Sequence, residues 1–206
     1  MKKTFLIASL TMLSFAAFAQ HEVGTLTIQP KIGLNIANFA GGEGSSDPRI
    51  GIAAGAEFEY QISKMFSLSA GLSYSMQGDK ETGFLYGLYV NTTAKTDYIN
   101  MPIMANIYVA KGFALKLGIQ PAVNVSAGYT ISTQGVEVSG KMFDLGIEVN
   151  SFDFAFPVGL SYEYKNFVAD ARYNFGVTKI YKDYQGVSFK DKNSVFQITL
   201  GYKFKL

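Results

Sequence analysis

From residue 26 onward, hydrophobic and polar side chains alternate with a period of two. The clearest run is 196–206, where Phe, Ile, Leu, Tyr, Phe and Leu hold the even positions and Gln, Thr, Gly, Lys and Lys the odd ones. Successive side chains of a β-strand point to opposite faces, so strict alternation predicts strands whose two faces meet different surroundings. The pattern therefore predicts an all-β protein.

Eight such runs follow one another along the chain. They are 26–38, 50–62, 66–77, 98–109, 113–129, 152–164, 167–177 and 196–206. Each reaches or exceeds the ~9–11 residues that a tilted strand needs to cross a bilayer, whereas ordinary strands average about 5–6. We therefore predict an eight-stranded antiparallel up-and-down transmembrane β-barrel.

The connections between these runs alternate between short and long. Tight turns are expected at 63–65, 110–111 and 165–166, and longer polar loops at about 40–49, 78–97, 130–151 and 179–193. Outer-membrane barrels have short periplasmic turns and longer external loops, and an even strand count brings both chain ends to the short-turn side. Segment 84–93 (FLYGLYVNTT) either extends a neighbouring strand above the membrane or forms a short hairpin within its loop.

Alternation alone does not say which face lines the barrel, because a soluble lipocalin-like barrel would enclose its apolar face. The weaker face here is mostly Gly, Ala, Ser, Asn and Gln, as at 67–77, instead of the Lys and Glu of a soluble exterior. Aromatic residues also gather near both ends of the strands, which is typical of the girdles of lipid-facing barrels. We therefore expect the apolar face to contact lipid.

That orientation sends four cations and four carboxylates into the lumen, all within about six residues of the nearest short turn or chain end. They are Lys31, Glu57, Glu59, Lys116, Glu163, Asp170, Arg172 and Lys203. Buried charges are tolerated when they are paired and hydrogen-bonded, so we expect these residues to form a salt-bridged plug. The favoured reading is lumen filling, and an ion or proton relay is the functional alternative. Small inward residues above the plug suggest a shallow vestibule open toward the long loops.

The first twenty residues resemble a secretory signal. Lys2 and Lys3 precede an apolar run, and Ala17-Phe18-Ala19 provides a cleavage pattern before Gln20. We expect a cleaved signal peptide at 1–19 and a barrel domain at 20–206. No later stretch has the ~18 consecutive apolar residues of a membrane helix.

Composition excludes several kinds of chemistry. The chain has no cysteine, which removes disulfides, thiol catalysis and thiolate metal sites, and its net charge of +2 makes nucleic acid an unlikely target. The one histidine, His21, lies beside the expected new N-terminus, where we expect a mobile tail. The glycine- and serine-rich segment 41–46 lacks the features of a nucleophile elbow. We expect no catalytic residue, no cofactor and no metal site.

Several segments resemble a known family of membrane barrels. PKIGLNIANF (30–39), LSAGLSYSMQGDK (68–80), DYINMPIMANI (97–107) and the pair FDFAFPVGLSYEY (152–164) and ADARYNFGVTKIY (169–181) are similar to strands of the Bacteroides-type, or PorT-like, outer-membrane β-barrel family. The resemblance covers roughly 26–206 and implies an eight-stranded barrel with a porin-family label. It brings no catalytic residues. One departure is Leu206 at the end of the chain, where many such barrels end in Phe.

These observations predict a monomeric protein of the Gram-negative outer membrane. We expect a largely filled lumen, with the outer loops serving a structural or surface-interaction role. The alternative is a narrow porin-like channel for very small solutes or ions. The expected partners are outer-membrane lipid, the barrel assembly machinery and an unidentified extracellular ligand or protein.

Overall fold

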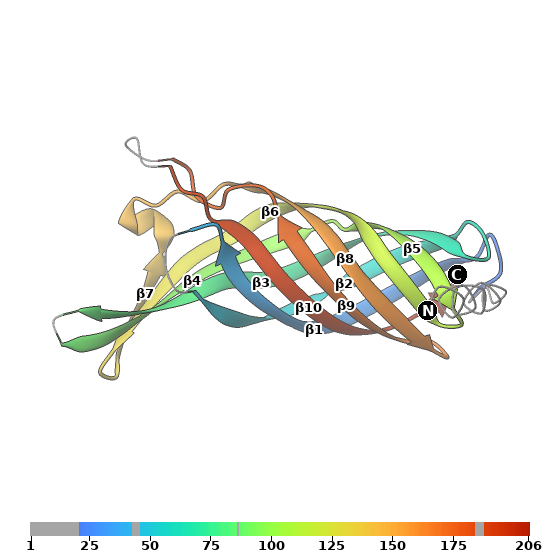
Figure 1. The fold of residues 1–206 in the computed structure, drawn as a ribbon, viewed down its shortest axis with the longest axis horizontal. Coiled ribbons are helices and arrows are strands. Elements are labelled where there is room, and N and C mark those ends of the chain that lie inside the picture. The colour runs from blue at the N-terminus through green and yellow to red at the C-terminus, as the bar shows by residue number, and fades with distance from the viewer. Residues whose placement is uncertain (1–20, 43–45, 86, 184–187) are drawn as a thin grey trace, which may run out of the picture.

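The computed structural model describes residues 21–42, 46–85, 87–183 and 188–206. The predicted signal peptide lies outside these ranges. The described residues form eleven strands in a single antiparallel sheet, together with one 3-10 helix, η1 (Figure 1). In chain order these are β1 Leu26–Ala40, β2 Asp47–Gln61, β3 Phe66–Leu85, β4 Leu88–Asn100, β5 Ile103–Ala110, β6 Phe113–Thr133, β7 Val136–Lys141, η1 Met142–Leu145, β8 Phe152–Tyr164, β9 Phe167–Gly176, β10 Lys192–Tyr202 and β11 Phe204–Lys205.

The sheet closes into a ring of eight strands, which confirms the predicted fold class. β1 pairs with β2 on one side and with β10 and β11 on the other, so the first and last strands close the barrel. β4 and β5 together make one barrel strand that is interrupted at Met101–Pro102, because proline has no N–H to donate to the ladder. β10 and β11 likewise make one strand, interrupted at Lys203. Both described ends of the chain lie at the short-turn end, where the Leu206 N–H donates to the Leu26 carbonyl at 3.0 Å.

The apolar face points outward, as the composition of the two faces predicts. Along β1, Lys31 is 6% exposed and buried in the lumen, whereas the next residue, Ile32, is 63% exposed on the barrel wall. The outward aromatic residues form two belts. Tyr60, Tyr164, Phe167 and Phe204 lie near the short turns, and Tyr74, Phe152 and Phe175 lie toward the long loops. The wall therefore has the girdled apolar surface of a lipid-facing barrel. No helix in the described part of the chain is long and apolar enough to span a membrane.

Two of the predicted long connections contain strands, because the barrel strands continue beyond the barrel wall. β3 and β4 stay paired up to Leu85 and Leu88, so 78–97 is a β-hairpin and segment 84–93 extends the neighbouring strands. β6 continues to Thr133 and turns back into β7, so the loop predicted at 130–151 begins as a second hairpin. Alternation weakens there because both faces of this part of the sheet lie outside the barrel. Figure 1 shows these strands projecting from the end opposite the chain termini.

Replacing Leu34 by Arg should destabilise the barrel in lipid. Leu34 pairs with Ile52 and Ile198 between the two aromatic belts, and a cation on the lipid face near the midplane costs about 2–4 kcal/mol. Urea unfolding in lipid vesicles, followed by circular dichroism because the chain lacks tryptophan, measures the loss. The control Val138→Arg on β7, beyond the barrel, should change the free energy of unfolding by less than about 0.5 kcal/mol. Equal losses in both variants would contradict the assigned lipid face.

Candidate functional site

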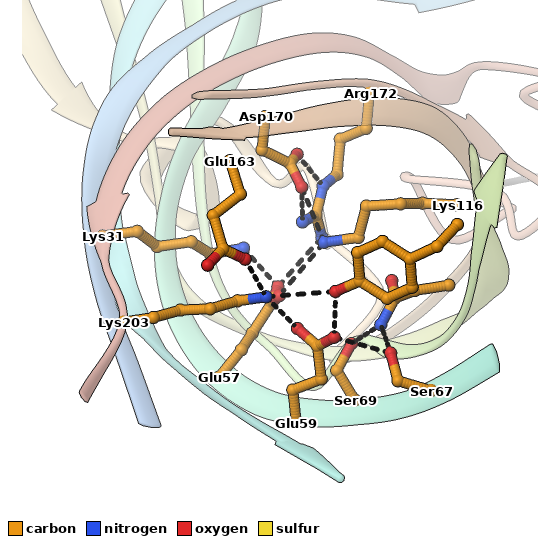
Figure 2. A network of polar contacts seen from close by, with 12 residues as sticks. Lys31, Glu57, Glu59, Ser67, Ser69, Lys116, Glu163, Asp170, Arg172 and Lys203 are labelled. Atoms are coloured by element: carbon orange, nitrogen blue, oxygen red, sulfur yellow. Dashed lines mark hydrogen bonds and ion pairs between the residues drawn. The ribbon is translucent and has the colours of Figure 1, made fainter. Parts of the chain in front are cut away.

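The candidate site is the group of eight charged side chains that the sequence assigns to the lumen. All eight are buried, and each makes at least one ion pair with another member (Figure 2). They divide into two groups at different heights. We call the group nearer the short turns the rim cluster, consisting of Glu59, Glu163 and Lys203. We call the other group the inner cluster, consisting of Lys31, Glu57, Lys116, Asp170 and Arg172.

The inner cluster is organised around Arg172. Its guanidinium donates from Nε to Asp170 Oδ1 at 2.8 Å and from Nη2 to Asp170 Oδ2 at 2.8 Å. A third donor, Nη1, reaches Glu57 Oε1 at 3.1 Å. This forked geometry is the one in which an arginine–carboxylate pair is strongest, because two parallel N–H groups meet two oxygens. Arg172 therefore joins carboxylates from β9 and, across the lumen, β2.

The two lysines complete the inner cluster. Lys116 Nζ lies 2.7 Å from Asp170 Oδ2 and 3.6 Å from Glu57 Oε2. Lys31 donates to Glu57 as well. The cluster thus holds three cations and two carboxylates, which leaves one positive charge in excess.

The rim cluster has the opposite imbalance. Lys203 Nζ lies 2.8 Å from Glu59 Oε2 and 2.9 Å from Glu163 Oε2, so one cation faces two carboxylates. Together the two clusters are neutral, with four charges of each sign. Since each carboxylate removed from water needs a cation within reach, this balance makes the burial of all eight charges tolerable.

Glycines opposite the charged residues provide the space that these long side chains occupy. Gly159 pairs with Lys116 on one side and with Arg172 on the other. A Cβ added at Gly159 would lie 2.7 Å from Arg172 Cβ, and one at Gly71 would lie 2.6 Å from Glu57 Cγ. An eight-stranded lumen is only wide enough to be filled by side chains, so large and small inward residues must alternate between strands. The glycine-rich face of the sequence is therefore the counterpart of the charged plug.

Comparison with known proteins places the chain among membrane barrels. A family model described as an outer membrane protein beta-barrel domain matches residues 18–182. The chain belongs to this family. No curated protein matches it.

Solved structures support the fold of this outer-membrane barrel. It is similar to the attachment invasion locus protein Ail of Yersinia pestis, with 14% identity and a TM-score of 0.50 over 89% of this chain and 100% of that chain. Ail in complex with the heparin analogue sucrose octasulfate matches with 15% identity and a TM-score of 0.51, with the same coverage. At such low identity the likeness concerns the fold alone.

The structure adds uncharged residues to the site that the sequence reasoning missed. Tyr108 donates its hydroxyl to Glu59 and accepts from Lys203 Nζ at 3.1 Å. Ser67 donates to Glu59 at 2.6 Å and accepts from Asn106 at 3.0 Å. Tyr108 lies on the same face as Asn106, so alternation could have placed it inside. Tyr108 was missed because aromatic residues were expected to face lipid.

His21 is not in a free tail, which corrects the sequence prediction. Its Nε2 lies 3.1 Å from Glu163 Oε1, and only 20% of its side chain is exposed. The histidine therefore covers the rim cluster at the short-turn end of the lumen. No group of three or more metal-ligating side chains that could hold an ion occurs within the described ranges.

Replacing Arg172 by Ala should be strongly destabilising, because Asp170 and Glu57 would keep their burial and lose their strongest partner. Breaking a buried pair costs roughly 3–5 kcal/mol, whereas an exposed pair contributes at most about 1 kcal/mol. The matched control is Lys182→Ala, whose Nζ lies 2.8 Å from Glu148 Oε2 with both side chains more than half exposed. Unfolding in lipid vesicles measures both losses, and similar values would show that the plug contributes no more than a surface ion pair.

Proposed function

We propose that this outer-membrane barrel is a closed, non-enzymatic surface protein that binds macromolecules outside the cell through the part of its sheet that projects beyond the barrel. We call this part the projecting sheet: residues 78–85 of β3, 88–97 of β4, 126–133 of β6, and β7. The observation that carries the proposal is that this sheet ends on one side in β7, a strand with a single neighbour. Within the described ranges, β7 pairs with β6 only.

The backbone of β7 offers hydrogen-bonding groups on its unpaired side. The two-residue turn Gln134–Gly135 has positive φ values of 46° and 83°, which is the geometry of a tight hairpin turn. Such a turn makes Thr133 and Val136 a hydrogen-bonded pair, so the groups of alternate residues, Glu137 and Ser139, point away from β6. A strand edge of this kind can take up an extended segment of another chain.

The tips of the projecting sheet carry apolar side chains that the barrel does not bury. Phe84 and Tyr89 are 67% and 69% exposed, and their ring centroids lie 5.1 Å apart. Val136 of β7 is exposed as well, and so is Phe143 of η1, which directly follows β7. Exposed aromatic residues beside a free strand edge supply the anchors that protein interfaces favour. These features support a role in recognition.

The plug supports a closed barrel over the alternative of a narrow channel. Arg172, Asp170 and Glu57 meet across the lumen within hydrogen-bonding distance, and eight strands leave little further width. The single histidine contacts Glu163, and among the described residues no serine is hydrogen-bonded to it, so a serine–histidine nucleophile finds no support. A filled lumen and an occupied histidine both favour a role for the outer surface.

We further propose that the chain belongs to the Bacteroides-type, PorT-like branch of its family, on the motifs at 30–39, 68–80 and 97–107. The signal at 1–19 would export it, and the barrel assembly machinery would insert it as a monomer. The mass of the mature protein tests the cleavage, with Gln20 as the expected first residue.

The purified protein should give no steady current in planar lipid bilayers at neutral pH, because the ion pairs close the lumen. The quadruple variant Glu57→Ser, Arg172→Ser, Glu59→Ser, Lys203→Ser shortens side chains in both clusters, removes two charges of each sign and should conduct. The control double variant Glu148→Ala, Lys182→Ala changes an exposed pair and should stay closed. A steady open-channel current through the unmodified protein would refute the closed barrel and establish the channel.

A photoreactive amino acid placed at Glu137 should form a discrete crosslinked protein adduct in intact cells, because this residue lies on the unpaired edge of β7. Adding Ser139→Pro, which removes a backbone donor from that edge, should reduce the yield several-fold. The control position is Lys165, in the short turn between β8 and β9 at the other end of the barrel. Adducts that are the same from both positions, or that Ser139→Pro leaves unchanged, would count against recognition by the β7 edge.

A further inference from the structure

A second feature of the outer end, separate from the β7 edge, is a cavity at the mouth of the barrel. It has a volume of about 670 Å³ and lies between the ends of β1 and β3 and the segment that leads into β10. Its size falls in the range of sites for small ligands, about 300–1,000 Å³. The side chains that define its chemistry are three rings and three carboxylates: Phe39, Tyr181, Phe189, Asp79, Glu81 and Asp191.

The three rings form one connected group. The ring of Tyr181 meets Phe39 edge-on at a centroid distance of 6.0 Å and Phe189 at 5.6 Å. Phe39 is an inward residue of β1 and pairs with Asn193 of β10. The rings thus give the cavity an aromatic wall that is fixed to the barrel, and the negative faces of such rings attract cations.

The three carboxylates are not neutralised by neighbouring cations. Among the described residues, none of them lies within ion-pair distance of a lysine or arginine, and residues 43–45 and 184–187 contain neither residue type. Two lysines on the segment around Tyr181 pair with other carboxylates: Lys179 with Asp183, and Lys182 with Glu148. Lys190 is the one positive residue among the described lining, so the cavity carries an excess of negative charge.

Burial and nearby carboxylates both affect two titrating groups at the cavity. Burial, and then the neighbouring carboxylates Asp191 and Asp47, raise the pKa of Asp79 above its ordinary value. Burial, and then the charge of Asp191, raise the pKa of the Tyr181 hydroxyl. Both shifts have the sign that burial of an acidic group produces, and the neighbouring carboxylates act in the same direction.

Buried acceptors below the cavity add to this imbalance. Gln77 and Asn193 lie two residues before Asp79 and two residues after Asp191, on the inward face, and are 3% and 4% exposed. Gln77 Oε1 and Asn193 Oδ1 have no hydrogen-bond partner in the described structure. Both atoms can only accept hydrogen bonds, so they would take donors from a bound molecule.

We propose that this cavity binds a small organic cation that carries ammonium groups on an aliphatic chain. The ammonium groups would meet Asp79, Glu81 and Asp191 and donate to the acceptors below, while the methylene groups would pack against the rings of Phe39, Tyr181 and Phe189. The site shares Asp79 and Glu81 of β3 with the projecting sheet but contains no residue of β7, so the proposal does not rest on recognition by the β7 edge.

Isothermal titration of the full-length mature protein in zwitterionic nanodiscs tests the proposal, with 1,4-diaminobutane and spermidine as probes. Both 1,4-diaminobutane and spermidine should bind. The uncharged 1,4-butanediol, which has the same four-carbon chain as 1,4-diaminobutane, should not bind. Asp191→Asn and Asp79→Asn should each weaken binding by about tenfold or more, because each removes a charged acceptor. Tyr181→Leu should weaken it several-fold through the loss of a ring face.

The matched control is Asp183→Asn, in the same segment as Tyr181 but paired with Lys179 outside the cavity, and it should bind as the unmodified protein does. Variants with an intact barrel are identified by the heat-dependent gel mobility that the unmodified protein shows. If Asp79→Asn fails to fold, Asp191→Asn still tests the proposal, because Asp191 lies outside the strands. The proposal is overturned if neither amine binds, if the diol binds equally, if Mg²⁺ at equal ionic strength displaces the amine completely, or if Asp183→Asn weakens binding as much as Asp191→Asn.

Discussion

Closure of the eight-stranded ring is the constraint on which the rest of the structure depends. In hydrocarbon each backbone N–H and C=O needs a partner within the protein, and pairing β1 with β10 and β11 leaves the barrel no open edge. Closure also fixes the lumen at a width that side chains alone can fill. Since lipid takes the apolar face, the polar face must fill that space, and it does so by setting glycines such as Gly159 opposite long side chains such as Arg172.

The charged plug works as one unit because neither of its clusters is neutral alone. The inner cluster has an extra cation and the rim cluster an extra carboxylate, so each depends on the other for balance. His21 and Tyr108 extend the rim cluster with groups that donate hydrogen bonds to its carboxylates. Burial of ion pairs is weak evidence for added stability, but it strongly penalises any arrangement that separates the partners. The ion pairs of the plug therefore favour the observed register of the strands that carry them.

The sequence predicts the barrel better than it predicts what extends beyond it. The strand count, the lipid face and the lumen positions of all eight charged residues follow from a period of two, since lipid and lumen impose opposite demands on neighbouring residues. This contrast disappears above the aromatic belt, where Thr82 and Thr92 face similar surroundings on either side, and the hairpins there looked like loops. The bulge between Asp97 and Tyr98 shifts the register of β4 against β6, and no side-chain pattern marks it. Strand order and register decide which charges pair with one another and bring His21 close to Glu163. The alternation within one strand does not reveal either of them.

The same strands thus pass through two different surroundings, the lipid bilayer and the water beyond it. Inside the membrane, β3, β4 and β6 are held on both sides by neighbours and filled from within by the plug. Beyond the membrane they continue as a sheet that has edges, because β2 leaves β3 at Lys80 and β7 has one neighbour. An edge in water keeps its hydrogen-bonding groups solvated and so costs little, whereas the same edge in lipid would be prohibitive. The protein can therefore expose unpaired backbone and rings such as Phe84 and Tyr89 at this end, and the proposed recognition by the projecting sheet is compatible with the proposed closed barrel.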